Sequence, residues 1–437
     1  MRKGRRSPRL GVAGLWHLGS VISAAWSGKG FRVTGFDPDP GTVRALSRGE
    51  PPVFEPGLKE ALSRSLGRKT LDFTSDVADL SGCDFVFLAF DTPVLDDDRS
   101  DLAPLENAVA SLGRVLKDGS IVIVSSQTPA GTCARFRKEL KSLNPALDCA
   151  YSPENLRLGE ALSNYLRPGR IILGAAEEST RRKVQKLFSA IPAEVVPMGL
   201  ASAEMVKHGI NAFLAGSVAF ANELADLCEN IGADVRDVVA GMKSDPRIGE
   251  RAYLSPGIGF SGGTLGRDLR VLDGISGNGG AGSLFGKALE SNGRRKAAIV
   301  AKIESLSPGG VRGRRIGVLG LTYKPGTSTL RRSLPAEIVR LLAERGALIT
   351  VFDPKADLGE WTGGAAPERA RSAEDVVRGS EIVLLLTEWP EFLALPWKKL
   401  AGSGRTVFDA KGFLAPLGLG DLGYRYHRIG NGEKRHA

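Results

Sequence analysis

LGVAGLWHLGSVISAAWSGKGFRVTGFD, residues 10–37, is the stretch that predicts the fold class. It reads as a strand over Leu10–Ala13, a glycine turn over Gly14–Gly19, a helix over Ser20–Ser27 and a strand over Phe31–Phe36 that ends in Asp37. A strand, a glycine turn, a helix and a second strand with a terminal acid are typical, in this order, of a dinucleotide-binding Rossmann domain.

The turn and the acid predict an NAD site. A glycine turn lets the amides at a helix N-terminus face a pyrophosphate, where the helix dipole favours negative charge. We therefore expect cofactor contacts from Gly14, Trp16, His17, Leu18 and Gly19. Asp37 is placed to accept hydrogen bonds from a ribose diol and to disfavour a 2′-phosphate, which favours NAD over NADP. Trp16 stands where GxGxxG has its middle glycine, so an ordinary α/β turn remains the alternative.

Two further apolar runs indicate buried parallel strands, at Phe85–Phe90 and Ile121–Ser126. Near-continuous runs of this kind are typical of strands covered on both faces. Polar residues follow each run, and in open parallel sheets ligands bind at the carboxyl ends of the strands. We therefore add Thr92, Pro93 and Gln127 to the expected cofactor contacts.

The rest of the chain predicts a long helix and then a second domain like the first. Apolar residues at helical spacing indicate one helix over Ala201–Ile231. After it the strand and helix layout repeats, with strands predicted at 314–320, 348–352, 381–387 and 406–408. The predicted fold class is α/β, with two doubly wound Rossmann-like domains joined by a central helical region. The predicted domains are residues 1–200, 201–305 and 306–437.

Composition excludes several classes of function. The net charge of +10 is dispersed along the chain and only 6% of residues are aromatic, which argues against nucleic acid and fits an anionic small molecule. Four cysteines without a CxxC pair indicate reduced thiols in a cytoplasmic protein, and four histidines without HExxH indicate no catalytic metal. No apolar run of the roughly 18 residues needed for a membrane span is present.

A second glycine-rich stretch, Pro256–Asp268, contains five glycines. A flexible linker would be rich in Ser and Gly, without the proline, the phenylalanine and the closing Arg267-Asp268 pair found here. Glycines at this density indicate a backbone that turns through positive φ or approaches a ligand closely. The stretch therefore predicts a site.

Taken together, these segments resemble the nucleotide-sugar 6-dehydrogenase family, which includes UDP-glucose and GDP-mannose dehydrogenases. The matching motifs are EPGL at 55–58, SPE at 152–154, RPGRI at 167–171, SAEMVK at 202–207, NELA at 222–225, DPRIG at 245–249, GLTYKPGT at 320–327 and TEW at 387–389. The Pro256–Asp268 stretch stands where the family has GFGGSCFPKD. The resemblance therefore extends over nearly the whole chain.

This resemblance implies an NAD-dependent enzyme of sugar-nucleotide or polysaccharide metabolism that forms a homodimer and binds a UDP-sugar through its last domain. The family oxidises the C6 alcohol of the sugar to a carboxylate in two hydride transfers, through a thioester on a cysteine. The implied catalytic positions are Glu154, Lys207, Asn211, Thr264 and Asp268. The implied substrate contacts are Arg247, Phe260, Gly262, Gly263, Lys324 and Arg331, with Lys411 as a further candidate.

Three of the positions that carry the family's chemistry differ. Thr264 replaces the nucleophilic cysteine, Leu158 a second glutamate and Gln127 a threonine. A threonine hydroxyl is a poor nucleophile without an adjacent base, so a thioester is excluded. The chain is therefore expected either to stop after one oxidation or to complete the second through a water-activated aldehyde hydrate. The alternative is a nucleotide-sugar-binding homologue without turnover, which retention of the charged site residues disfavours.

Overall fold

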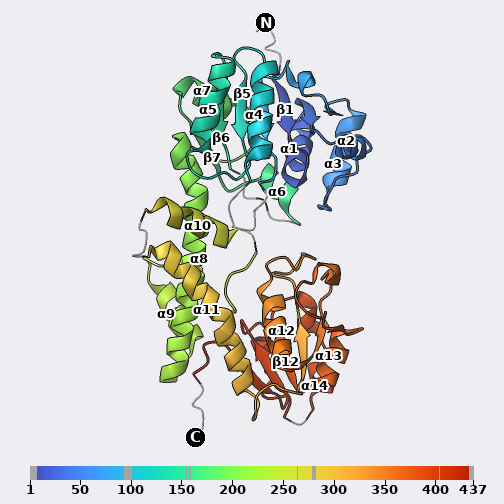
Figure 1. Ribbon diagram of the computed structural model, residues 1–437, viewed down its shortest axis with the longest axis vertical. Coiled ribbons are helices and arrows are strands. Elements are labelled where there is room, and N and C mark those ends of the chain that lie inside the picture. The colour runs from blue at the N-terminus through green and yellow to red at the C-terminus, as the bar shows by residue number, and fades with distance from the viewer. Residues whose placement is uncertain are drawn as a thin grey trace. The chain divides into compact units, whose positions relative to one another are not determined.

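The computed structural model describes residues 7–92, 101–153, 156, 159–262, 264–277, 282–402 and 404–432. They form two compact units, Met1–Gly209 and Ile210–Ala437, each built on one sheet. Helix α8 (Leu200–Ile231) is continuous over 32 residues and belongs to both (Figure 1). The predicted fold class is thereby confirmed. No helix in the described ranges is long and apolar enough to cross a membrane.

The sheet of the first unit has the order β3-β2-β1-β4-β5-β6-β7-β8. Its strands are β1 (Arg9–Ala13), β2 (Arg32–Phe36), β3 (Leu71–Thr74), β4 (Phe85–Leu88), β5 (Ile121–Val124), β6 (Asp148–Tyr151), β7 (Ile171–Ala175) and β8 (Val195–Met198). Pairing is parallel from β3 to β6, and β7 is antiparallel to β6. The order reverses between β1 and β4, and such a switch point is where ligands bind in open α/β sheets.

Helices cover both faces of this sheet. They are α1 (His17–Gly28), α2 (Pro40–Ser47), α3 (Leu58–Gly67), the 3-10 turn η1 (Val77–Leu80), α4 (Ala103–Val115), α5 (Thr132–Leu143), α6 (Ala161–Leu166) and α7 (Glu178–Phe188). Because the strands are apolar on both faces, each face has its own core. On the α1 side the fully buried Trp26 packs against the rings of Phe31, Phe87 and Phe188 at 5.2, 5.7 and 5.8 Å.

The second unit contains a fully parallel sheet of order β11-β10-β9-β12-β13-β14. Its strands are β9 (Arg315–Leu319), β10 (Leu348–Phe352), β11 (Glu368–Arg369), β12 (Ile382–Leu385), β13 (Thr406–Asp409) and β14 (Arg425–Arg428). Its helices are α9 (Val235–Ser244), α10 (Leu265–Ile275), α11 (Leu284–Ser305), α12 (Leu334–Glu344), α13 (Ala373–Gly379) and α14 (Trp397–Leu400), with 3-10 turns η2 (Leu358–Glu360), η3 (Pro390–Ala394) and η4 (Ala415–Leu417).

Small side chains let α10 and α11 approach the second half of α8. Ala212, Ala215 and Ala219 of α8 share a buried cluster with Leu269 of α10 and Ala288 of α11. Figure 1 shows α10 and α11 beside α8. This packing places the start of α10, which follows the second glycine-rich stretch, next to α8.

Candidate cofactor and substrate sites

The first glycine turn has the geometry of a dinucleotide-binding turn. Gly14 has φ +90°, and its N–H donates to the carbonyl of Phe36 at 2.9 Å. A Cβ on Gly19 would lie 1.7 Å from the carbonyl oxygen of Gly14. Only glycine at position 19 therefore lets α1 begin directly against the turn. A Cβ on Gly14 would likewise lie 2.6 Å from the backbone nitrogen of Phe90, so neither position has room for a side chain. Leu18, also predicted to contact the cofactor, is buried.

Asp37 lies at the carboxyl end of β2, as predicted, and is partly exposed. One carboxylate oxygen accepts the N–H of Leu15 at 2.8 Å, and the other accepts the N–H of Asp39 at 3.0 Å. Each oxygen of an ionised carboxylate has two acceptor positions. Both oxygens therefore keep one position for a ribose hydroxyl. The turn and Asp37 fit the adenosine half of NAD, whose nicotinamide, when bound, accepts the hydride.

His17 has a partner that the sequence did not predict. Its Nε2 lies 2.8 Å from Oε2 of Glu55, whose side chain is fully buried. The other oxygen of Glu55 accepts the N–H of Ala161, the first residue of α6, at 2.9 Å. Glu55 therefore connects the cofactor turn to α6. The EPGL motif was the signal that marked Glu55 in the sequence.

The polar ends of β4 and β5 meet at the carboxyl edge of the sheet. The hydroxyl of Thr92 donates to the carbonyl of Gln127 at 3.0 Å. Two of the predicted cofactor contacts are thus brought together. Pro93, the predicted catalytic Glu154 and the substituted position Leu158 lie outside the described residues.

The start of α8 is held at the same edge by two buried side chains that the sequence analysis missed. Glu204 accepts the N–H groups of Gly131 and Cys133 at 2.7 and 2.8 Å, and so caps the N-terminus of α5. His208 Nε2 contacts the carbonyl of Thr128 at 3.0 Å. Lys207 lies between these two anchors. Its position relative to the carboxyl end of β5 is therefore set by Glu204 and His208.

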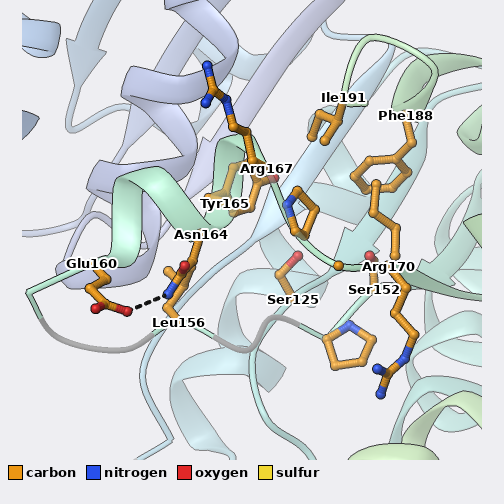
Figure 2. Close-up of a pocket in the computed structure, with 14 residues that line it drawn as sticks. Ser125, Ser152, Leu156, Glu160, Asn164, Tyr165, Arg167, Arg170, Phe188 and Ile191 are labelled. Carbon is orange, nitrogen blue, oxygen red and sulfur yellow. Dashed lines mark hydrogen bonds between the residues drawn. The ribbon is translucent and has the colours of Figure 1, made fainter. Parts of the chain in front are cut away.

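A pocket of about 290 Å³ opens beside the carboxyl ends of β5 and β6 (Figure 2). Ser125 and Ser152 contribute to it from the strand ends, together with Asn164, Tyr165, Arg167 and Arg170. The hydroxyl of Tyr165 accepts the indole N–H of Trp26 at 2.9 Å, which ties the pocket wall to the core. The Arg167–Ile171 motif therefore lines a cavity at the ligand-binding edge of the sheet.

In the second unit Asp268 and Asn211 are brought together in a buried cluster. Asp268 is fully buried, and its carboxylate accepts a short hydrogen bond from the Asn211 side-chain amide. Arg267 is also buried, with Nε 3.7 Å from the Asp268 carboxylate. Arg267 had no predicted role, although it is adjacent to Asp268 in the sequence. Lys207 precedes Asn211 by one turn of α8, so the spacing puts both on one helix face.

Thr264 immediately precedes α10 and is exposed. Its hydroxyl caps none of the described N–H groups of the helix, whereas its carbonyl accepts the N–H of Asp268 at 3.1 Å. All four cysteines of the chain are buried. Burial raises the pKa of Cys83 to about 11 and raises that of Cys133 well above its usual value. The position of the family's nucleophile therefore carries a hydroxyl, and the native thiols are sequestered.

The glycine-rich stretch before Thr264 is pinned by side chains. Asn222 accepts the Gly257 N–H at 2.7 Å, and Arg295 Nε donates to the Gly257 carbonyl at 3.0 Å. Asn292 bonds both backbone groups of Phe260, at 2.8 and 2.9 Å. The Phe260 side chain packs in the cluster between α8 and α10. The stretch is thus a held loop, and the packing gives Phe260 a structural role beside the predicted substrate contact.

The same loop lies against the carboxyl edge of the second sheet. The Gly262 N–H donates to the Arg332 carbonyl at 3.1 Å, and a Cβ on Gly262 would lie 3.4 Å from the Tyr323 ring. The Lys324 ammonium is 5.7 Å from the centre of that ring. A Cβ on Gly257 would meet the Lys411 side chain at 3.1 Å. The structure therefore brings Gly262 and Lys324 to one sheet edge.

The other predicted substrate contacts are placed as follows. Arg247 is exposed, and its guanidinium pairs with Asp245 at 2.7 Å. Arg331 is exposed. Lys411 forms a close ion pair with Glu388, which belongs to the TEW motif. Gly263 lies outside the described residues. The substrate roles of these residues stay predictions.

The second sheet repeats the glycine turn of the first, but the acid that follows its second strand is occupied by hydrogen bonds within the protein. Gly320 has φ +89° and donates to the Phe352 carbonyl at 2.9 Å, as Gly14 does to Phe36. Asp353 corresponds to Asp37 in position. Its carboxylate is buried and accepts the Leu321 N–H at 2.8 Å and the Trp389 indole N–H at 3.0 Å. Asp353 therefore cannot serve a ribose as Asp37 can.

Three family models match the chain in order. They are the NAD binding, central and UDP binding domains of the UDP-glucose/GDP-mannose dehydrogenase family, over residues 8–192, 201–293 and 317–416. The NAD model covers the turn with Asp37, and the UDP model begins within β9, in the sheet whose edge borders the glycine loop. The two sheets therefore lie in domains that the family models name for different ligands, NAD and UDP.

Similar proteins match nearly the whole chain. The UDP-glucose 6-dehydrogenase of Pseudomonas aeruginosa is 32% identical over 451 residues, covering 98% of this chain and 99% of the relative. That of Rhizobium meliloti is 30% identical, covering 97% and 99%. A UDP-glucose dehydrogenase structure from Pyrobaculum islandicum matches with a TM-score of 0.84 and 30% identity over 99% of both chains. A UDP-D-ManNAc dehydrogenase structure from Pyrococcus horikoshii matches with 0.81 and 25%, covering 97% and 99%.

Proposed function

Because the chain belongs to the UDP-glucose/GDP-mannose dehydrogenase family and is an NAD-dependent nucleotide-sugar dehydrogenase, we propose that it oxidises the C6 alcohol of UDP-glucose and stops at the aldehyde. One two-electron step removes a hydride from C6, which passes to NAD, and a proton from the C6 hydroxyl, which passes to a protein base. This proposal rests on one observation. The family's cysteine position carries Thr264, while the nearby buried cluster of Asp268, Asn211 and Arg267 is present.

The retained cluster supports the alcohol step. Proton transfer needs a base, and the buried Asp268 is a carboxylate with Asn211 and Arg267 as partners. Lys207 and Asn211 share one face of α8, where an ammonium and an amide stabilise negative charge on the substrate oxygen. In this assignment Asp268 accepts the proton, directly or through Lys207. Retention of this buried carboxylate together with Asn211 and Lys207 supports an enzyme over a binding protein without turnover.

The exposed Thr264 supports arrest at the aldehyde. The second oxidation of an aldehyde needs a nucleophile to add to its carbon before a further hydride can leave. A threonine hydroxyl has a far higher pKa than a thiol and is weakly nucleophilic without a base. With the four cysteines buried, none of them is exposed to replace it. The aldehyde is therefore the expected product.

The assay is direct. Purified protein is incubated with NAD and UDP-glucose, with GDP-mannose as the alternative substrate, and NADH is counted against sugar consumed. We expect one NADH per UDP-glucose and a product that hydrazine traps as the aldehyde. Two NADH per sugar would overturn the single step and favour the aldehyde hydrate. No NADH with either sugar would overturn the proposed activity.

We also propose that the protein is a homodimer formed through α8. Phe213, Phe220, Leu227 and Ile231 are 72, 51, 60 and 79% exposed, and we call them the α8 stripe. They are spaced by seven, seven and four residues, so they lie along one face of the helix. Exposed apolar rows of this kind mark protein–protein contacts. Near the stripe, a Cβ on Gly216 would meet open space, which allows a second helix to approach closely.

A charge in the α8 stripe is expected to separate the subunits. Phe220→Glu should shift the mass measured by light scattering after gel filtration from dimer to monomer, because a carboxylate in an apolar interface loses its hydration. Phe54→Glu is the matched control, since Phe54 is 86% exposed but lies in the first unit, outside the stripe. A wild-type monomer, or a dimer that survives Phe220→Glu, would contradict the assignment.

A further inference from the structure

Trp16 is the residue of the cofactor turn that neither the fold nor the core explains. It is the N-cap residue of α1, and its side chain forms no capping hydrogen bond to the described helix. Trp16 is 49% exposed, whereas Trp26, Trp389 and Trp397 are buried. Gly14 and Gly19 on either side are required by close packing. The turn therefore keeps its two structural glycines and carries a large ring at the position between them.

The side chain of an N-cap residue can reach the first turn of its helix. This is why Ser, Thr, Asp and Asn at that position accept hydrogen bonds from the N–H groups of the second and third helical residues. In α1 those groups belong to Leu18 and Gly19. First-turn N–H groups have no acceptor within the helix, and they are the donors that a pyrophosphate uses. A large side chain at position 16 can therefore occupy the space that a pyrophosphate needs.

An indole cannot replace the pyrophosphate as a partner for these donors. It has one N–H and no acceptor. A glycine at the middle position of this turn leaves the space empty, so that the backbone can approach the phosphates. Trp16 has φ −65°, a value open to any residue, so the tryptophan is accommodated without backbone strain. The tryptophan therefore preserves the fold of the turn but limits the access of a pyrophosphate to the first N–H groups of α1.

We infer that the Trp16 indole is a side-chain gate over the pyrophosphate site, which must rotate away from the start of α1 before NAD binds. The inference rests on the family's NAD assignment and not on the proposed sugar or product. Apparent affinity falls by the fraction of molecules with the gate open. If the open rotamers are populated about one time in ten, removal of the indole lowers the dissociation constant about tenfold.

The test is Trp16→Gly, with calorimetric titration of ADP-ribose, the part of the cofactor that the turn and Asp37 contact. We expect the ADP-ribose dissociation constant to fall about tenfold, as the open fraction above requires. Trp16→Phe, which keeps a ring, should retain the wild-type affinity. Adenosine offers a ribose to Asp37 but has no phosphate, and its affinity should be the same for all three proteins. In turnover, the KM for NAD should fall in Trp16→Gly and stay at the wild-type value in Trp16→Phe.

Three results would overturn the gate. Equal or weaker ADP-ribose binding by Trp16→Gly would show that the indole is neutral or contributes a contact. An equal gain for adenosine would place its effect away from the phosphates. Absence of ADP-ribose binding to all three proteins would also refute it. A failure of UDP-glucose to reduce NAD would count against the proposed function alone, because the binding titrations contain no sugar. Gly is itself an acceptable N-cap, so Trp16→Gly should fold.

Discussion

Thr264→Cys is expected to raise the yield of NADH from one to two per sugar and to convert the product from an aldehyde to a carboxylate. The cysteine thiolate adds to the C6 aldehyde, the adduct loses a second hydride to NAD, and water cleaves the resulting thioester. The position suits a thiolate, because it is exposed and precedes α10. Helix N-termini lower thiol pKa values.

The chain offers matched controls for this gain of function. Thr264→Ser keeps a hydroxyl and should stay at one NADH per sugar. The four native cysteines are buried, and burial raises the pKa of Cys83 to about 11, so they should react slowly with Ellman's reagent at pH 8. The variant should therefore show one additional fast-reacting thiol. A titratable new thiol with unchanged NADH stoichiometry would contradict the prediction and would implicate the substitutions at Leu158 and Gln127.

Asp268→Asn is expected to lower kcat by about 10²- to 10⁴-fold, the usual contribution of a positioned general base. Asp268 is fully buried and accepts the Asn211 amide, so its carboxylate has a defined orientation. An asparagine has nearly the same shape but cannot take the C6 hydroxyl proton. Steady-state oxidation of UDP-glucose measures the loss.

Folding must be separated from chemistry in this variant, because the exchange removes the negative charge beside the buried Arg267. UDP binding should be retained in Asp268→Asn, since the UDP binding domain begins at residue 317. Glu290→Gln is the control, because Glu290 is an exposed carboxylate of α11. A variant that binds UDP normally and turns over at the wild-type rate would exclude Asp268 as the base.

Much of the architecture was predictable because its signals are local. The buried strands are short apolar runs, and α8 was predicted as Ala201–Ile231 and observed as Leu200–Ile231. The cofactor turn, the helix that follows it and Asp37 all lie within residues 10–37, so their pattern could be recognised in one short stretch of sequence. The order of strand, glycine turn, helix and strand with a terminal acid repeats around Gly320 and Asp353, so the sequence also predicted a second unit of the same kind.

The partners of the site residues were not predictable, because they come from distant segments. Glu204 caps α5 across 73 and 71 residues, and Asp268 meets Asn211 across 57. Arg295 reaches the Gly257 carbonyl across 38 residues. The hydrophobic periodicity of a sequence contains no information about hydrogen bonds between such distant residues. They arise only when helices and loops pack and buried polar groups must find partners.

Because motifs and substitutions are read along the chain, the family, the two Rossmann-like units and the threonine at position 264 were all accessible from the sequence alone. Which of the two similar sheets keeps an acid that can accept hydrogen bonds from a ligand depends on tertiary packing. Asp37 retains acceptor positions at the edge of the first sheet, whereas Asp353 is buried beneath the Trp389 indole. The physical reason is burial, since the same carboxylate in the same turn can bind a ligand only where its oxygens remain free to accept.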